Sequence, residues 1–220
     1  AYAERLAAST IRLDERVDVG RLDRYNLPRT DRGAHDRFMR IYPEGTNSIT
    51  LWDVAATGMM QYSSNAASDY LLERLQPVDW ESLYLRLSLT NTDFPHSLTM
   101  IPLLMNNHET GRVSMDDLDG LSIEQGESYL DRYIHDDPWR QAEIAYRTRP
   151  SSLFPAWSVQ TAILQQHTAT GTAVDALKIM RAIYDGGGPL SDAVKSMART
   201  ALRWTESEFV SNNYVEYGSK

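Results

Sequence analysis

Apolar residues recur every three to four positions in several separated parts of this chain, which is the spacing of one face of an α-helix. The pattern is clearest after small polar residues that can cap a helix, at Thr50, at Ser64 and at Thr172. An aspartate follows three positions after each threonine, which approximates a capping box. The apolar residues that follow are Leu51, Val54, Ala55 and Met59; Leu71, Leu72 and Leu75; and Ala173, Leu177, Met180 and Tyr184.

Most of the remaining chain is also predicted to be helical, interrupted by segments rich in Gly, Pro, Asp and Arg. Residues 21–46 lack periodicity and are predicted as a long surface loop, and residues 90–120 as irregular structure. Alternation favours a short extended connection at 11–17 and a turn leading into a strand at 208–218. Without an internal repeat, residues 1–220 are predicted as one mainly helical domain. The further helices are expected at 1–10, 79–87, 121–134, 138–147 and 191–204.

Composition narrows the class of protein. The 220 residues carry a formal net charge of −8, which disfavours a nucleic acid as partner. The absence of cysteine removes disulfides, thiolate catalysis and Cys-based zinc sites. No histidine has the spacing of a metal motif, so neither a metal nor a cofactor is predicted. No apolar stretch approaches the ~18 residues of a membrane span. The oligomeric state is left open.

The candidate chemistry lies at Ser63, Ser64 and Asn65, three small polar residues between two helical stretches. Such residues also form ordinary turns and helix caps, because their side chains bond to nearby backbone groups. The triplet alone therefore does not indicate a functional site, and the flanking sequence is needed to distinguish a site from a turn.

Four stretches, in the right order, resemble the class A serine β-lactamases and the penicillin-interacting DD-peptidases, which build one pocket from S-x-x-K, S-D-N or S-x-N, and K-T-G motifs. Residues 51–75, "LWDVAATGMMQYSSNAASDYLLERL", are similar to the surroundings of the second motif. Residues 6–19 are similar to the end of the nucleophile helix and the connection after it. Residues 72–94 are similar to the next two helices, and residues 168–191 to the helix that reads "T-T-A-R-D-M-A" in the family.

The resemblance implies a fold. This chain would be the helical subdomain of an α/β sandwich whose antiparallel sheet comes from residues outside the sequence. No serine here is followed three positions later by lysine, so the S-x-x-K nucleophile is expected upstream of residue 1, and the chain is expected to be a fragment. The chain alone would then not acylate, because a nucleophile must lie within hydrogen-bond reach of its base.

The resemblance also implies roles for individual residues. Ser63 would relay a proton to the leaving nitrogen, and Asn65 would hydrogen-bond both the substrate's amide carbonyl and the lysine of the first motif. Ser64 stands where class A enzymes have Asp, a position that varies in the penicillin-interacting enzymes. Lys220, in "YGSK", would be the K-T-G lysine, attracting a substrate carboxylate; an ordinary surface lysine is the alternative.

A class A β-lactamase also needs a glutamate on an ω-loop that activates the deacylating water. Glu127, in "ESYLD", is the nearest match, but it falls in a helical segment, where a solvated carboxylate is the alternative. If Glu127 has no such role, a DD-peptidase, an esterase-like hydrolase or a penicillin-binding relic is favoured over an efficient β-lactamase. Residues 100–150 would replace the ω-loop and could roof the pocket.

The resulting hypothesis is a penicillin-recognising serine hydrolase that acts on a β-lactam or a D-alanyl-D-alanine-type amide through an acyl-serine. Its partners would be β-lactams or peptidoglycan stem peptides. Family resemblance places it in the periplasm or outside the cell. The alternative is a non-catalytic binding or regulatory module that kept the same scaffold.

Overall fold

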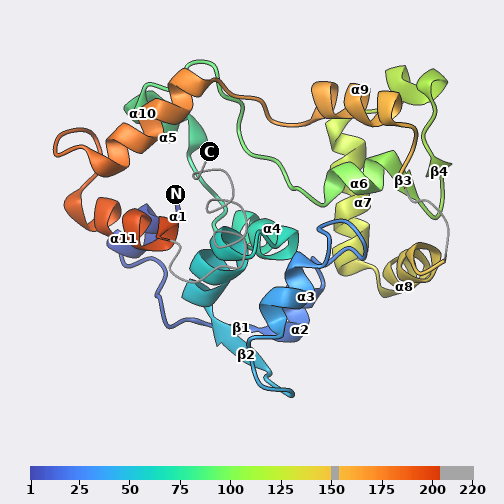
Figure 1. Ribbon diagram of the computed structural model, residues 1–220, viewed down its shortest axis with the longest axis horizontal. Coiled ribbons are helices and arrows are strands. Elements are labelled where there is room, and N and C mark those ends of the chain that lie inside the picture. Colours follow the sequence, from blue (N-terminus) through green and yellow to red (C-terminus); the bar gives the residue numbers. More distant parts are fainter. Residues whose placement is uncertain (150–153, 204–220) are drawn as a thin grey trace, which may run out of the picture.

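The computed structural model describes residues 1–149 and 154–203, and this part of the chain is mainly helical (Figure 1). One helix, η1, is a π-helix, and another, η2, is a 3₁₀-helix. The helices are α1 (Tyr2–Ala7), α2 (Val19–Asp23), α3 (Ala34–Met39), η1 (Asp53–Gln61), α4 (Asn65–Arg74), α5 (Trp80–Leu87), α6 (Met100–Met105), η2 (Met115–Gly120), α7 (Ile123–His135), α8 (Asp137–Arg147), α9 (Trp157–His167), α10 (Ala173–Tyr184) and α11 (Asp192–Leu202).

Within the described residues, the strands form two short antiparallel pairs. Strand β1 (Arg16–Asp18) pairs with β2 (Ser48–Thr50), and Val17 lies opposite Ile49. Strand β3 (Asn106–Asn107) pairs with β4 (Gly111–Arg112). The first pair brings residues on either side of α2 and α3 together, directly before η1.

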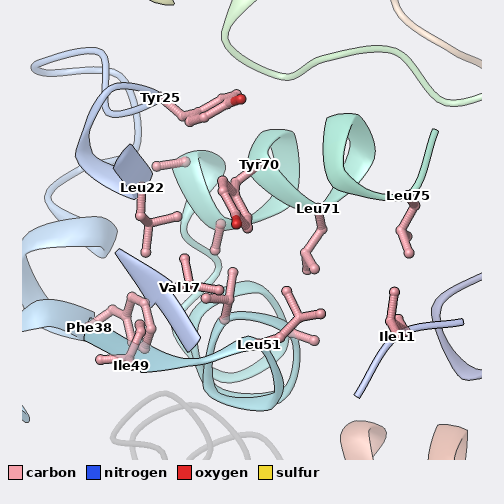
Figure 2. Close-up of a cluster of buried hydrophobic side chains, with 14 of the residues drawn as sticks. Ile11, Val17, Leu22, Tyr25, Phe38, Ile49, Leu51, Tyr70, Leu71 and Leu75 are labelled. Atoms are coloured by element: carbon pink, nitrogen blue, oxygen red, sulfur yellow. The ribbon is translucent and has the colours of Figure 1, made fainter. Parts of the chain in front are cut away.

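The main hydrophobic core lies against α4. Figure 2 shows Leu71 and Leu75 on the side of α4 that faces Leu51 and Ile11. The period of three to four residues that predicts this helix puts Leu71 and Leu75 on one face, and burying each of them contributes about 1.5–3 kcal/mol; Leu72, also predicted to face inward, is only partly buried. The other buried members of the cluster are Leu6, Val17, Leu22, Tyr25, Phe38, Ile49, Val54, Ala55, Ala66, Ala67, Tyr70 and Ile134.

Two further groups of helices flank this core. Helices α1, α5, α10 and α11 gather on one side of α4, and α6, α7, α8 and α9 on the other (Figure 1). The second group has its own apolar clusters, one around Met100 and Ile163 and one around Tyr133 and Trp139. No helix in the described ranges combines the length and the apolar character needed to cross a lipid bilayer.

The helix predicted directly after Ser63–Asn65 is confirmed, and so are the helix starts predicted at Thr172 and Ser191. The side chains of Ser64, Thr172 and Ser191 each accept a backbone N–H of the first turn that follows. The long loop predicted at 21–46 is wrong, because this stretch contains the last residues of α2 and all of α3. Each is only 5 or 6 residues long, too short for a periodic pattern to be visible.

Residues 90–120 were expected to be irregular, but they contain α6, η2 and the pair β3–β4. Helix α9 was not predicted either. The strand predicted at 208–218 lies outside the described residues.

Candidate functional site

The triplet Ser63 to Asn65 forms the corner between η1 and α4. Helix η1 ends with a bond from the Tyr62 N–H to the Thr57 carbonyl (3.0 Å), the five-residue spacing of a π-helix, and the Ser64 N–H donates to the Gly58 carbonyl (2.9 Å). Ser63 adopts the left-handed conformation, with φ of 59°. Ser88 has the same conformation where it ends α5, so the backbone of Ser63 marks a helix stop.

Ser64 is fully buried and fixes the start of α4. Its Oγ accepts the N–H of Ala67 (3.2 Å), which caps the helix. Its carbonyl oxygen accepts both the N–H and the hydroxyl of Ser68. Ser63 is exposed and Asn65 is partly buried, so these two flanking residues are the members of the triplet that reach the surface. They are also the two to which the family resemblance gives roles.

A histidine from the mispredicted loop region contacts this corner. Nδ1 of His35, on α3, lies 2.9 Å from the Ser64 Oγ. Its Nε2 lies 2.8 Å from Oδ1 of Asp23, at the end of α2. The His35 side chain is only 2% exposed, whereas that of Asp23 is half-exposed. Serine, histidine and aspartate therefore form a continuous hydrogen-bonded chain.

The hydrogen-bonded Ser64, His35 and Asp23 have the composition of a catalytic triad but not its geometry. In such a triad, the imidazole Nε2 faces the serine and Nδ1 faces the carboxylate, whereas here the two nitrogens are exchanged. The Ser64 hydroxyl is also buried and already caps α4, so it has no access to a substrate. The arrangement positions the corner, and Ser64 is not a nucleophile.

Close packing fixes the other side of the corner. A Cβ placed on Gly58, whose carbonyl accepts the Ser64 N–H, would lie 2.7 Å from Cε1 of Phe38 and 3.0 Å from Cβ of Ala67. Only glycine lets η1 approach α3 and α4 this closely. The Phe38 ring also lies against Tyr62, with ring centroids 6.0 Å apart.

Asp69 fastens α4 to a distant turn, just beyond the corner. Its carboxylate accepts the N–H groups of Leu98 (2.7 Å) and Thr99 (2.8 Å). Burial of this carboxyl raises its pKa, against the opposing effect of these hydrogen bonds. The turn that leads into α6 is thereby held against α4.

A second aspartate joins two of the stretches that resemble the β-lactamase family. Asp175, in the first turn of α10, accepts the N–H groups of Asn91 (2.8 Å) and Thr90 (3.2 Å) and the hydroxyl of Thr92 (3.1 Å). Asp93 in turn accepts the N–H and hydroxyl of Thr170. Residues 90–93 therefore lie against the start of α10.

The two other candidates of the sequence analysis are not at the corner in the described structure. Glu127 lies on the exposed face of α7, in the middle of a helix and not on a loop. Its role as the deacylating base stays a prediction, and its position is that of a solvated carboxylate. Lys220 lies outside the described residues, so its predicted approach to Ser63 and Asn65 stays untested.

Sequence reasoning missed His35 and Asp23. They are separated from Ser64 by 29 and 41 positions and belong to no spacing motif, so no signal in the sequence joins them to the corner. In the described part of the chain, no group of three or more His, Cys, Asp or Glu side chains is placed as metal ligands would be.

Comparisons with models of protein families, with curated proteins and with solved structures find no match to this chain. Its function therefore has to be inferred from the residues themselves.

Proposed function

We propose that this chain is the helical part of a penicillin-recognising serine hydrolase. Its substrate would be a β-lactam or a D-alanyl-D-alanine-type amide of a peptidoglycan stem peptide, and its nucleophile a serine upstream of Ala1. The finer fold, an α/β sandwich with an antiparallel sheet supplied by other residues, belongs to the same proposal, as does a location in the periplasm or outside the cell.

The observation that carries the proposal is the difference in burial between Ser64 and the two residues beside it. The middle residue, Ser64, is buried and bonded on both sides, whereas Ser63 and Asn65 reach the surface from a fixed backbone. A hydroxyl and a carboxamide presented in this way suit a proton relay and an amide-binding group. An ordinary helix cap would need only the middle residue.

The proposed reaction assigns one task to each side chain. The upstream serine loses its proton to a neighbouring base and forms a C–O bond with the amide carbonyl carbon. The C–N bond breaks as the protonated base gives its proton to the Ser63 oxygen and the Ser63 hydroxyl gives its own proton to the leaving nitrogen. Asn65 holds the carbonyl side of the substrate, and Lys220 attracts its carboxylate. Water then cleaves the acyl ester, which gives a carboxylic acid and restores the serine.

Contacts elsewhere in the molecule are compatible with this proposal. Helix α1, proposed as the end of the nucleophile helix, packs into the same core as η1 and α4 through Leu6. Tyr2 of α1 also stacks on Trp52, directly before η1, with ring centroids 6.4 Å apart. Residues upstream of Ala1 would therefore join the molecule beside the helix that ends at the corner.

The test uses the full-length protein and a fluorescent penicillin, followed by mass spectrometry. We expect one covalent adduct with the mass of the intact penicillin. Ser63→Ala should slow labelling by about 100-fold or more, since a positioned proton relay contributes about 10²–10⁴-fold. Ser128→Ala, at an exposed serine on α7, is the matched control and should label at the wild-type rate. Asn65→Ala should weaken labelling through loss of the amide contact.

Two results would count against the proposal. If the wild-type protein forms no adduct, the enzyme assignment fails, and a non-catalytic binding or regulatory module is favoured. If Ser63→Ala labels as fast as Ser128→Ala, Ser63 loses its assigned role.

Turnover separates a β-lactamase from a DD-peptidase. Because Glu127 is exposed on a helix, we expect slow deacylation, with D-alanine release from a stem peptide exceeding nitrocefin hydrolysis. Glu127→Gln should leave the lifetime of the acyl-enzyme unchanged. A longer lifetime in this variant would instead assign Glu127 as the deacylating base.

A further inference from the structure

We propose that His35 and Asp23 are positioning residues of the Ser63–Asn65 corner, acting through the buried hydroxyl of Ser64. The inference rests on the proposed function, because it concerns how that site is held. It assigns a task to two residues that no sequence motif identifies.

With a neutral imidazole, one arrangement of the hydrogen atoms pairs both ring nitrogens. The Asp23 carboxylate only accepts, so the proton of a neutral His35 imidazole belongs on Nε2, which donates to Oδ1 at 2.8 Å. Nδ1 is then an acceptor and takes the Ser64 hydroxyl proton at 2.9 Å. The Ser64 Oγ keeps its lone pairs for the Ala67 N–H. Both imidazole nitrogens and the Ser64 hydroxyl are then paired, which favours one orientation of the Ser64 side chain.

The imidazole itself is held firmly. The His35 ring packs edge-on against Phe38, with centroids 6.2 Å apart, and the His35 backbone N–H donates to Oδ2 of Asp31 (2.9 Å). Because the side chain is only 2% exposed, the ring has no room to turn toward solvent. The network thus joins α2, α3 and the start of α4 at one point.

This junction matters for Ser63 and Asn65 because both are bonded directly to Ser64 along the chain. A change in the Ser64 backbone or side chain shifts the exposed hydroxyl and the carboxamide together. Misplacing reacting groups by about 1 Å costs about 10²-fold in rate. An apolar residue at position 35 could fill the same space, but it would leave the Ser64 hydroxyl proton without its acceptor.

The test compares variants of the full-length protein by the rate of acylation with a fluorescent penicillin and by its noncovalent affinity before acylation. His35→Leu should lower the acylation rate about 10- to 100-fold and change the affinity much less. His35→Asn can still accept the Ser64 hydroxyl proton at the place of Nδ1, so it should recover most of the rate. Asp23→Ala should give an intermediate loss, because the ring stays in place but the proton is no longer held on Nε2, so Nδ1 is an acceptor in only part of the molecules.

His108→Leu is the matched control. It removes another imidazole–carboxylate contact, between Nδ1 of His108 and Oε2 of Glu143 (2.9 Å), which belongs to α8 and not to the corner. This control should unfold more easily than the wild type but acylate at a similar rate below its unfolding transition. Equal rate losses in His35→Leu and His108→Leu would overturn the inference, since they would show only a general loss of stability.

Amide hydrogen exchange at Ser64 and Ala67 provides a readout that does not need acylation. His35→Leu should accelerate exchange at both amides by about 10-fold or more, and His35→Asn should restore protection. Unchanged exchange would overturn the positioning role, whether or not the protein acylates. If the wild type does not acylate but exchange responds as expected, the proposed function fails and His35 still positions this corner.

Discussion

Two buried aspartates hold distant loops in this molecule, yet their pKa values move in opposite directions. Asp69 of α4 accepts the N–H groups of Leu98 and Thr99, and Asp175 of α10 accepts those of Thr90 and Asn91. Burial raises the pKa of Asp69. The pKa of Asp175 is lowered to about 2, first by a hydrogen bond from Lys178 and next by the backbone of Asn91.

The opposite directions have two causes, the burial of Asp69 and the partner cation of Asp175. The ammonium group of Lys178 lies 2.6 Å from Oδ1 of Asp175, whereas the backbone N–H groups of Leu98 and Thr99 that donate to Asp69 are neutral. At Asp69 the loss of water outweighs the hydrogen bonds to the carboxylate, whereas at Asp175 the hydrogen bond from Lys178 and those from the loop outweigh it. The turn at Leu98 and Thr99 is therefore held by hydrogen bonds from neutral groups. The loop at 90–92 is held by an aspartate that also forms an ion pair.

The largest loss of stability is expected on substitution of Asp69, whose hydrogen-bond donors are neutral. Asp69→Ala removes the carboxylate acceptor from the buried N–H of Thr99 and the partly exposed N–H of Leu98. A buried unsatisfied group costs about 1–3 kcal/mol and the partly exposed one adds less, so the free energy of unfolding should fall by about 2–4 kcal/mol. Urea unfolding followed by circular dichroism measures this loss. Asp69→Asn keeps one acceptor oxygen and should lose less. A loss below about 0.5 kcal/mol in Asp69→Ala, the range of ordinary surface substitutions, would show that water replaces the carboxylate.

A smaller loss of stability is expected on substitution of Asp175, which forms an ion pair with Lys178. Asp175→Asn keeps an acceptor for the loop at 90–92 but removes the ion pair with Lys178, so the thermal midpoint at pH 7 should fall by less than in Asp69→Ala. Differential scanning calorimetry of both variants gives the comparison. A midpoint equal to that of the wild type would mean that the hydrogen bonds alone hold α10, as they do at α4.

The comparison also shows what the sequence could not predict. Thr50 with Asp53 and Thr172 with Asp175 have the same spacing and predict the same capping box. At the first site both reciprocal bonds form, the Thr50 N–H donating to Asp53 and the Asp53 N–H to the Thr50 Oγ (3.0 Å each). At the second site only the threonine caps, since the Asp175 carboxylate turns to the loop at 90–92.

The start of each helix could therefore be predicted, because it depends on neighbours within one turn. The direction of the Asp175 carboxylate could not, because it depends on a loop more than 80 positions away. The same limit explains the candidate site. Ser63 to Asn65 follow from a local pattern, whereas His35 reaches Ser64 only after two short helices, invisible in the periodicity, have folded.

The contributions of Asp69 and Asp175 to stability should also depend on pH in opposite directions, which is a smaller effect. The folded-state pKa of Asp175 is lowered, so its contribution is present above the ordinary value of 3.8 and is lost as the pH falls toward about 2. The folded-state pKa of Asp69 is raised, so the part of its contribution that depends on protonation is present below 3.8 and is lost as the pH rises through the raised value. Unfolding at a series of pH values should give opposite slopes for wild type minus Asp175→Asn and wild type minus Asp69→Asn. Slopes of the same sign would contradict the assigned role of Lys178.

The smallest effect is expected when the cation is removed and the carboxylate kept. The Lys178 side chain is one-third exposed, so water screens part of its interaction with Asp175, and Lys178→Met should lower the thermal midpoint less than Asp175→Asn does. Without the ammonium group, the pKa of Asp175 should rise toward its ordinary value, because the largest of the lowering causes is gone. The pH at which Asp175 stops stabilising the loop should therefore move upward, which two-dimensional NMR titration of the Asp175 carboxyl carbon would measure directly.

Arg181→Met, on the same helix but outside this ion pair, is the control and should leave that titration unchanged. If Lys178→Met also leaves it unchanged, the backbone N–H groups of Thr90 and Asn91 suffice to keep the carboxylate ionised, and the contrast with Asp69 then lies in burial instead of charge.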